Sequence, residues 1–147
     1  MVMQPFSRGT VRLASGSPDA APVVDPRYLS DPRDVQAMVA GLKIAREIGR
    51  AKALAPWRAA EVLPGPGVDT GGALRHYANQ TMGSYFHPVG TCRMGTDDMS
   101  VVDPELRVHG ISGLRIADGS IMPSTVSGNT NATVYAIAER AAALVGR

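Results

Sequence analysis

The chain has 147 residues, of which 44% are hydrophobic and 19% charged, a balance that indicates a folded globular protein and excludes a disordered segment. The 15 basic and 13 acidic side chains leave a formal charge of only +2 and form no basic run, so the charge indicates neither a nucleic-acid partner nor a membrane surface. Cys92 is the single cysteine, which excludes an internal disulfide and, without other ligands at suitable spacing, predicts no metal site.

The first third of the chain predicts one strand and one helix. Small or polar residues alternate with apolar ones over residues 9–13, as in a half-buried strand, and a loop is expected over residues 15–26. A helix then begins, with Asp31 as its cap and Pro32 as its first residue, and it continues to about Gly49. Its apolar stripe, which we expect to have a packing role, comprises Val35, Met38, Val39 and Leu42.

The start of the chain has no basic flank followed by a long apolar run. This pattern predicts neither a secretion signal nor a membrane anchor there, and we expect a cytoplasmic protein.

The middle of the chain predicts an irregular connection and a second helix. Prolines and glycines crowd residues 55–72, and a shorter helix is expected over residues 73–80. Gly65, Gly67 and Gly71 loosely resemble a dinucleotide-binding fingerprint. Their spacing differs from Gly-X-Gly-X-X-Gly and the nearby prolines would resist a strand-to-helix turn, so we reject that interpretation.

The last third of the chain predicts a strand that ends beside a ligand, followed by a helix. Residues 114–117 form a short apolar run that ends in Asp118 and Gly119, as in a buried strand that leads into a ligand-facing loop. Residues 132–145 are rich in alanine, valine, isoleucine and leucine and contain neither glycine nor proline. This composition predicts a largely buried helix.

The three histidines differ in their sequence context. A lone histidine is more often structural or solvated than catalytic. His76 falls in a predicted helix and His109 in a predicted turn, whereas His87 lies in a glycine-rich segment between predicted elements. Only His87 is placed like a site residue.

Four motifs from His87 onward occur in a fixed order. The first is His87-Pro88-Val89-Gly90-Thr91-Cys92-Arg93-Met94-Gly95. The second covers residues 102–108, the third residues 113–120, and the fourth is Ser127-Gly128-Asn129-Thr130-Asn131-Ala132. Together they resemble the C-terminal signature of the glucose-methanol-choline (GMC) oxidoreductase family, strongly over residues 84–145 and more weakly over residues 7–48. The fourth motif looks more like choline dehydrogenase and related alcohol dehydrogenases than like glucose oxidase.

The resemblance implies catalytic roles for His87 and Asn129. In the family, the histidine at this position lies beside the flavin and acts as the base or hydrogen-bond partner of the substrate hydroxyl. An imidazole can take up that proton at neutral pH. The second catalytic position of the family is histidine or asparagine, and an amide donates a hydrogen bond to the developing alkoxide but is no base, so the base role falls to His87. Without the resemblance, Asn129 would be read as a turn or capping residue.

The resemblance also implies FAD as the cofactor. Asp118 and Gly119 match the segment that meets the ribityl-pyrophosphate part of FAD, although Asp118 also fits a role as the cap of a turn. Asn131 and Ala132 match the turn beside the flavin ring. Because Asn131 precedes the predicted helix, we expect the first amides of that helix to point at the pyrimidine edge and to stabilise negative charge on reduced flavin. Cys92 and its neighbour Arg93 are expected to be structural.

The fold implied is α+β, the C-terminal part of a two-domain flavoprotein. Residues 1–84 would belong to the substrate domain, with antiparallel strands and helices. Residues 85–147 would carry the catalytic histidine and the last strand and helix of a Rossmann-like FAD-binding domain.

In the family, the dinucleotide fingerprint lies near the N-terminus of a much longer chain. The expected partners are therefore a small alcohol substrate and an N-terminal FAD-binding half, in cis or in trans, and the isolated chain is expected to be inactive. The alternative is a non-catalytic relic or an interaction subunit that complements a separate FAD-binding half. The choice of alcohol, and of oxygen or another electron acceptor, stays open.

Overall fold

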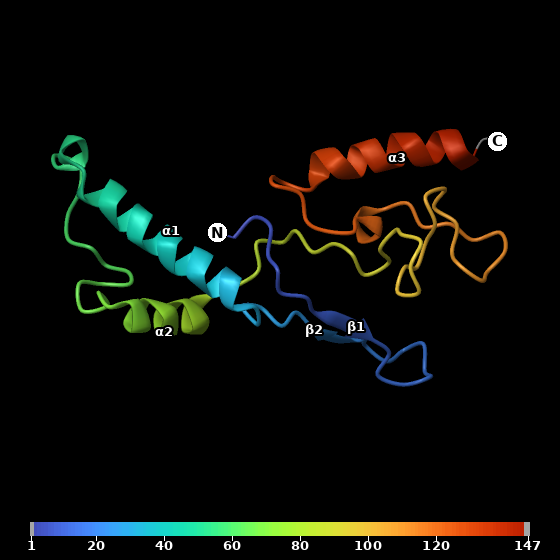
Figure 1. Cartoon of the computed structure of the whole chain (residues 1–147), viewed down its shortest axis with the longest axis horizontal. Coiled ribbons are helices and arrows are strands. Elements are labelled where there is room, and N and C mark those ends of the chain that lie inside the picture. Colours follow the sequence, from blue (N-terminus) through green and yellow to red (C-terminus); the bar gives the residue numbers. More distant parts are fainter. Residues whose placement is uncertain (1, 146–147) are drawn as a thin grey trace. The chain divides into compact units, whose positions relative to one another are not determined.

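The computed structural model describes residues 2–145 and has an α+β composition (Figure 1). The chain divides into two compact units. The first unit contains the residues up to Thr10 together with Val24–Gly83, and the second contains Val11–Val23 together with the described residues from Ser84 onward. The assignment of residues 1–84 and 85–147 to a substrate domain and an FAD-binding domain remains a prediction. Every helix within residues 2–145 is too short or too polar to cross a membrane.

Two short strands form the sheet of this chain. β1 (Thr10–Arg12) pairs with β2 (Val23–Asp25), and all six residues are exposed. The strand expected over residues 9–13 is therefore present but is not half-buried. The continuous loop expected over residues 15–26 is wrong, because the β-branched pair Val23 and Val24 lies opposite β1 and extends. That pairing joins residues too far apart for local composition to indicate it.

The two longer helices of the first unit begin at the side-chain caps that their sequences provide. Asp31 accepts a hydrogen bond from the Arg33 amide and Pro32 is the first residue of α1 (Pro32–Arg50), as expected. Thr70 caps α2 (Gly71–Thr81) through the Ala73 amide, 3.1 Å away. The two helices pack side by side (Figure 1). The apolar stripe of α1, Val35, Met38, Val39 and Leu42, is half-buried, in keeping with a packing role.

A buried carboxylate connects the start of the chain to α1. Asp34, in the first turn, is only 1% exposed, and its oxygens accept hydrogen bonds from the backbone amides of Phe6 and Ser7 at 2.8 Å and from the Ser7 hydroxyl at 2.5 Å. Burial raises the pKa of Asp34, but the bonds from Ser7 and Phe6 outweigh it and the net pKa is lowered. The carboxylate therefore stays charged while it anchors the segment.

A second polar contact holds the irregular connection between the helices. Arg46 of α1 makes a two-pronged ion pair with Glu61, with its shortest contact at 2.6 Å, and donates to the carbonyls of Gly65 and Val68. The short 3-10 helix η1 (Lys52–Leu54) precedes this segment. Proline and glycine thus predict the irregular backbone correctly, and the arginine fork fixes its path.

The second unit builds its core from loops and one helix. Val102, Leu106, Ile121, Ala141 and Leu144 form its buried cluster. Isolated bridges join Met94 to Val102, Val102 to Val108 and Arg107 to Arg115. The last helix, α3 (Asn131–Val145), packs on the 3-10 helix η2 (Gly119–Ile121). Single bridges and one helix face therefore take the place of an extended sheet.

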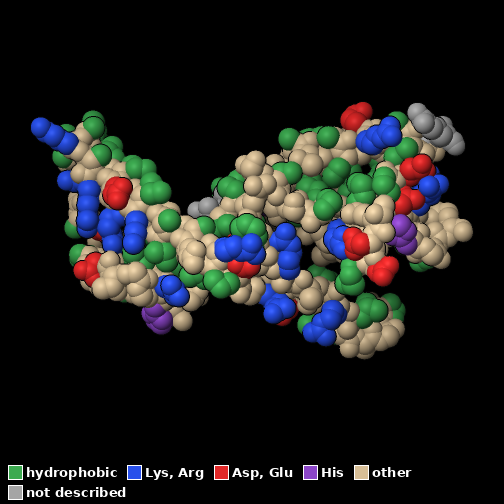
Figure 2. Space-filling model, in the orientation of Figure 1, with side chains coloured by type: hydrophobic (Ala, Val, Ile, Leu, Met, Phe, Trp, Pro, Cys, Tyr) green, Lys and Arg blue, Asp and Glu red, His purple; other side chains and the backbone are tan. Residues whose placement is uncertain are grey.

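Two expectations for this unit are wrong. Residues 114–117 form no strand: Arg115 makes a single bridge and Leu114 is exposed. A buried parallel strand needs neighbours on both edges and both faces, and within residues 2–145 this segment has only the single antiparallel bridge to Arg107. The helix α3 is present, but only Ala141 and Leu144 are buried, and Tyr135 is 69% exposed. Hydrophobic side chains accordingly lie on the molecular surface (Figure 2). Apolar composition predicts burial only where other elements cover the helix.

Candidate active site

Three segments of the second unit meet around Gly119. The backbone amides of Cys92 and Met94 donate to the carbonyls of Ser120 and Ile121 at 3.0 and 2.8 Å, which ties the segment after His87 to η2. A Cβ placed on Gly119 would lie 3.5 Å from Val134 Cγ2 in α3 and 3.9 Å from Val89 Cγ1. The His87 segment, η2 and the start of α3 are therefore packed together.

His87 is half-buried in the loop between α2 and the first of these contacts. Its Nδ1 lies 3.1 Å from the hydroxyl oxygen of Thr130. The ring of Tyr85 meets the imidazole edge to face, with 5.6 Å between ring centroids. The imidazole is therefore held through Nδ1, and no described residue is hydrogen-bonded to Nε2.

Thr130 also lies at this site, although its local sequence does not single it out. It is 9% exposed and directly precedes α3, and its carbonyl accepts the first helical hydrogen bond, from Val134 at 3.0 Å. A threonine before an apolar helix predicts an N-cap, whose side chain would bond the helix amides. The hydroxyl instead faces a histidine 43 positions earlier, a partner that local sequence does not indicate.

Asn129 and Asn131 flank Thr130 in the chain, so their backbone lies next to the residue that contacts His87. The side chain of Asn129 is exposed and is not hydrogen-bonded to any described residue. Asn131 and Ala132 are the first residues of α3 and are also exposed. Because the Thr130 hydroxyl bonds His87, the first-turn amides of α3 have no side-chain cap within residues 2–145. Such amides, at the positive end of a helix, attract a negatively charged group.

Asp118 and Gly119 lie in the same place through η2. Asp118 caps η2 by accepting a hydrogen bond from the Ser120 amide at 2.7 Å. Hydrogen bonds from Ser120, its side chain first and its amide second, lower the pKa of Asp118, so the exposed carboxylate is charged at neutral pH. The alternative role of Asp118, the cap of a turn, is confirmed.

The arrangement brings together a histidine, an amide side chain, uncapped helix amides and a carboxylate. This donor and acceptor set fits the polar parts of a flavin dinucleotide, whose ring develops negative charge on reduction and whose chain carries hydroxyls.

The other two histidines lie elsewhere: His76 is exposed on α2, and Nε2 of His109 donates to the Gly95 carbonyl at 3.1 Å. Within residues 2–145, no three His, Cys, Asp or Glu side chains are grouped to hold a metal ion.

Cys92 and Arg93 both have structural surroundings. Cys92 is a half-buried free thiol, and the guanidinium of Arg93 is paired with Asp97 in the same loop. These contacts agree with the roles expected for the two residues.

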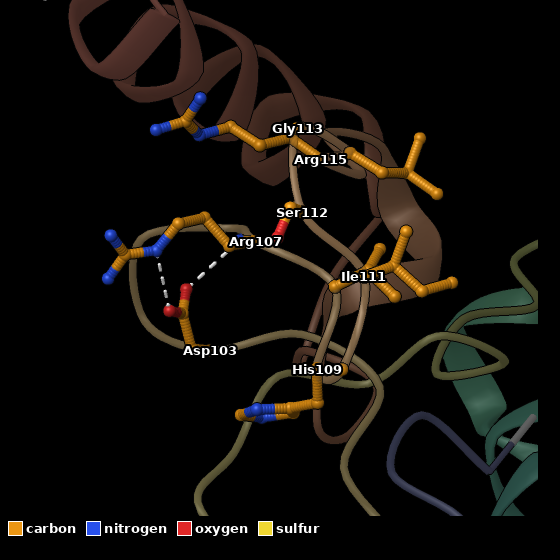
Figure 3. A pocket seen from close by; sticks show the side chains of 10 residues that line it. Asp103, Arg107, His109, Ile111, Ser112, Gly113 and Arg115 are labelled. Atoms are coloured by element: carbon orange, nitrogen blue, oxygen red, sulfur yellow. Dashed lines mark hydrogen bonds and ion pairs between the residues drawn. The ribbon is translucent and has the colours of Figure 1, made fainter.

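An open hollow of about 540 Å³ lies apart from these residues, in the loop from Asp103 to Arg115 (Figure 3). Arg107 there donates to Asp103 through its backbone amide and its side chain, both at 2.9 Å. None of the expected site residues lines the hollow. Of the charged side chains that line the hollow, Asp103 and Arg107 form an ion pair with each other.

Known proteins resemble this chain over nearly all its length. A family model described as GMC oxidoreductase matches residues 5–138. Choline oxidase of Arthrobacter globiformis is 50% identical over 95% of the chain, and alcohol dehydrogenase [acceptor] of Pseudomonas putida is 46% identical over 97% of it. A solved FAD-dependent oxidoreductase from Chaetomium thermophilum is 36% identical, with a TM-score of 0.88 over 97% of the chain. The chain spans 26% of the length of each of the first two proteins and 25% of the third.

Proposed function

The chain belongs to the GMC oxidoreductase family of flavoproteins, and on this premise we propose that it is the C-terminal catalytic region of an FAD-dependent enzyme that oxidises an alcohol to an aldehyde or ketone. The observation that carries the proposal is the convergence of His87, the turn at residues 129–131 and the segment at Gly119. These are the segments in which the family signature has its catalytic and flavin-contacting positions.

The chemistry gives His87 a defined task. An alcohol becomes a carbonyl when its carbon loses a hydride with the electron pair and its hydroxyl loses a proton. FAD, when bound, supplies the acceptor for the hydride. The hydroxyl proton goes to Nε2 of His87, the ring nitrogen not bonded to Thr130. The electrons of the O–H bond then form the second bond of the carbonyl, so atoms and charge balance.

Asn129 would stabilise the oxygen from which the proton departs. Its amide group is exposed, has no partner among the described residues and lies one residue from Thr130. An amide N–H aimed at a developing alkoxide lowers the energy of the transition state more than that of the bound alcohol.

Four further residues would hold the cofactor. Asp118 and Gly119 would meet the ribityl-pyrophosphate part of FAD, and Asn131 and Ala132 would present the first amides of α3 to the flavin ring. Uncapped amides and a charged carboxylate support these roles. The rest of the FAD site would come from an N-terminal half in cis or in trans, with residues 1–84 completing part of the substrate domain around a small alcohol.

The proposal is tested in the FAD-loaded protein that carries this chain. His87→Ala should slow flavin reduction by the alcohol by roughly 10²- to 10⁴-fold, the usual contribution of a positioned acid–base group. Stopped-flow absorbance of the flavin measures this rate. His76→Ala, on the exposed face of α2, is the matched control. Reduction of His87→Ala at the control rate would remove His87 from the mechanism.

The amide role has its own test in the same assay. Asn129→Ala should raise the barrier to flavin reduction by roughly 2–4 kcal/mol while the flavin content stays the same, as for the loss of one hydrogen bond to a developing oxyanion. An unchanged reduction rate would return Asn129 to the role of a turn residue.

A further inference from the structure

The hydroxyl of Thr130 is used in an unusual way for a residue at the start of a helix. At this position a threonine side chain normally bonds the amides of the second or third helical residue. In α3 the hydroxyl oxygen instead lies 3.1 Å from Nδ1 of His87. The helix loses a cap that is typically worth about 1 kcal/mol, and the imidazole gains a partner.

The partner is held rigidly. The Thr130 carbonyl accepts the first helical hydrogen bond of α3, and the side chain is almost fully buried. A β-branched side chain has few accessible rotamers, so a fixed backbone also fixes its hydroxyl. Thr130 therefore controls both the position of Nδ1 and the plane of the imidazole ring.

A neutral imidazole carries one N–H and one lone pair, and a threonine hydroxyl can donate or accept, so the direction of the hydrogen bond at Nδ1 determines the state of Nε2. If the Thr130 hydroxyl donates to Nδ1, Nε2 carries the hydrogen of the neutral ring and cannot accept the proton of the alcohol. If Nδ1–H donates to the Thr130 oxygen, Nε2 carries the lone pair. We propose that Thr130 is a positioning residue that selects the Nδ1–H tautomer of His87, so that Nε2 faces the alcohol as a proton acceptor. This inference rests on the proposed role of His87 as the base.

His109 provides an internal reference for the other tautomer, with the hydrogen on Nε2. Its Nε2 lies 3.1 Å from the carbonyl oxygen of Gly95, which can only accept. Neutral His109 must therefore hold its hydrogen on Nε2. His87 and His109 lie in the same unit, so one spectrum of that unit contains both tautomers.

The first test is a long-range ¹H–¹⁵N NMR spectrum of the FAD-loaded protein that carries this chain, with ring-labelled histidine, at about pH 9, where imidazoles are neutral. The signals of His87 and His109 are assigned from the spectra of His87→Gln and His109→Gln. We expect the Nδ1–H pattern for His87 and the Nε2–H pattern for His109. In Thr130→Val, which keeps the shape but removes the hydroxyl, His87 should shift toward Nε2–H while His109 is unchanged; Thr130→Ser should keep the wild-type pattern. An Nε2–H pattern for wild-type His87 beside an intact His109, or no change in Thr130→Val, overturns the proposal.

The second test measures flavin reduction in the FAD-loaded protein and separates this inference from the proposed function. Thr130→Val should reduce the flavin about 10- to 100-fold more slowly at unchanged flavin content, as for a misplaced reactive group, and Thr130→Ser should restore most of the rate. If His87→Gln is slow but Thr130→Val is as fast as wild type, the positioning role of Thr130 is wrong. If His87→Gln is as fast as wild type, the proposed function of His87 is wrong.

Discussion

Gly90 lets the loop that carries His87 run close to η2. Its φ is +87°, in the left-handed region, and a Cβ at this position would lie 3.2 Å from the carbonyl oxygen of Met122. Both features favour the residue without a side chain. The place of His87 beside α3 therefore depends on a glycine three positions later.

Gly90→Ala should lower the free energy of unfolding of the second unit by about 1–2 kcal/mol, because it adds left-handed strain and crowds the Met122 carbonyl. Urea unfolding followed by circular dichroism measures the change. Gly110→Ala shares the positive φ, +76°, but its Cβ would meet no atom within 4 Å, so it isolates the cost of strain. If the two variants lose equal stability, the close approach to Met122 contributes nothing.

At this scale the sequence identifies residues whose role follows from a motif and misses those defined by a distant partner. His87 stands out because it lies in a glycine-rich segment outside the predicted helices and turns. Thr130 does not, because its bond to His87 spans 43 positions. Asp118 shows a local role, the cap of η2, that its sequence context predicts.

Among the elements, α1 depends on a charge at its start. The helix begins at Pro32, and Asp34 lies in its first turn, where a negative charge favours the positive helix end. Its carboxylate in fact accepts three hydrogen bonds from Phe6 and Ser7. These bonds lower the pKa of Asp34 despite its burial. A charge near the helix start was predictable, but the segment that it anchors was not.

Asp34→Asn should lower the free energy of unfolding by about 2–3 kcal/mol at neutral pH, because the amide is uncharged and has one acceptor oxygen, which leaves a donor of Phe6 or Ser7 without an acceptor. The folded-state pKa of Asp34 is below the ordinary 3.8, so the stability it contributes is present above pH 3.8 and is lost as the pH falls through the lower value. The difference in free energy of unfolding between wild type and variant should therefore be constant near neutral pH and should decrease in acid. Asp19→Asn, in an exposed loop, should show no such difference at any pH. A difference for Asp34→Asn that is independent of pH would contradict the role of its charge.

Helices and strands differ in how much of them the sequence predicts. Helices α1, α2 and α3 form where apolar spacing, a capping residue or a run without glycine indicates them, because these signals lie within the helix itself. The strand β2 and the absent strand at residues 114–117 depend on pairing partners. A strand needs a neighbour, and neither error can be detected from composition alone.

At the scale of the whole molecule, the chain exposes apolar surface that α3 would bury in a larger protein. Tyr135 and Val145 of α3 are largely exposed, and the chain spans about a quarter of its relatives' length. Exposed apolar patches of this kind mark interaction sites or a tendency to associate. The proposed N-terminal half is the partner that fits.

The 147 residues expressed by themselves should therefore be colourless and self-associating, because on the proposed function most contacts to FAD would come from the N-terminal half. Flavin absorbance and size-exclusion chromatography measure the two properties. Coexpression with an N-terminal half from a related flavoprotein should yield a yellow complex, and its alcohol-dependent reduction would distinguish a split enzyme from a relic. A soluble monomer with stoichiometric FAD would show that the site around Asp118 and Asn131 is complete in this chain.

The interleaving of the two units in the sequence governs how the protein can be cut and made. The second unit contains Val11–Val23, which lie between two stretches of the first, so the chain passes from one unit to the other three times. A ribosome releases residues 11–23 long before residue 84, so the rest of the second unit does not yet exist when this segment emerges. A protease cut between Gly83 and Ser84 would leave those 13 residues covalently attached to the wrong fragment. A truncation that begins at Ser84 therefore lacks part of the second compact unit, and fragment-based studies of the His87 site should start upstream of Val11.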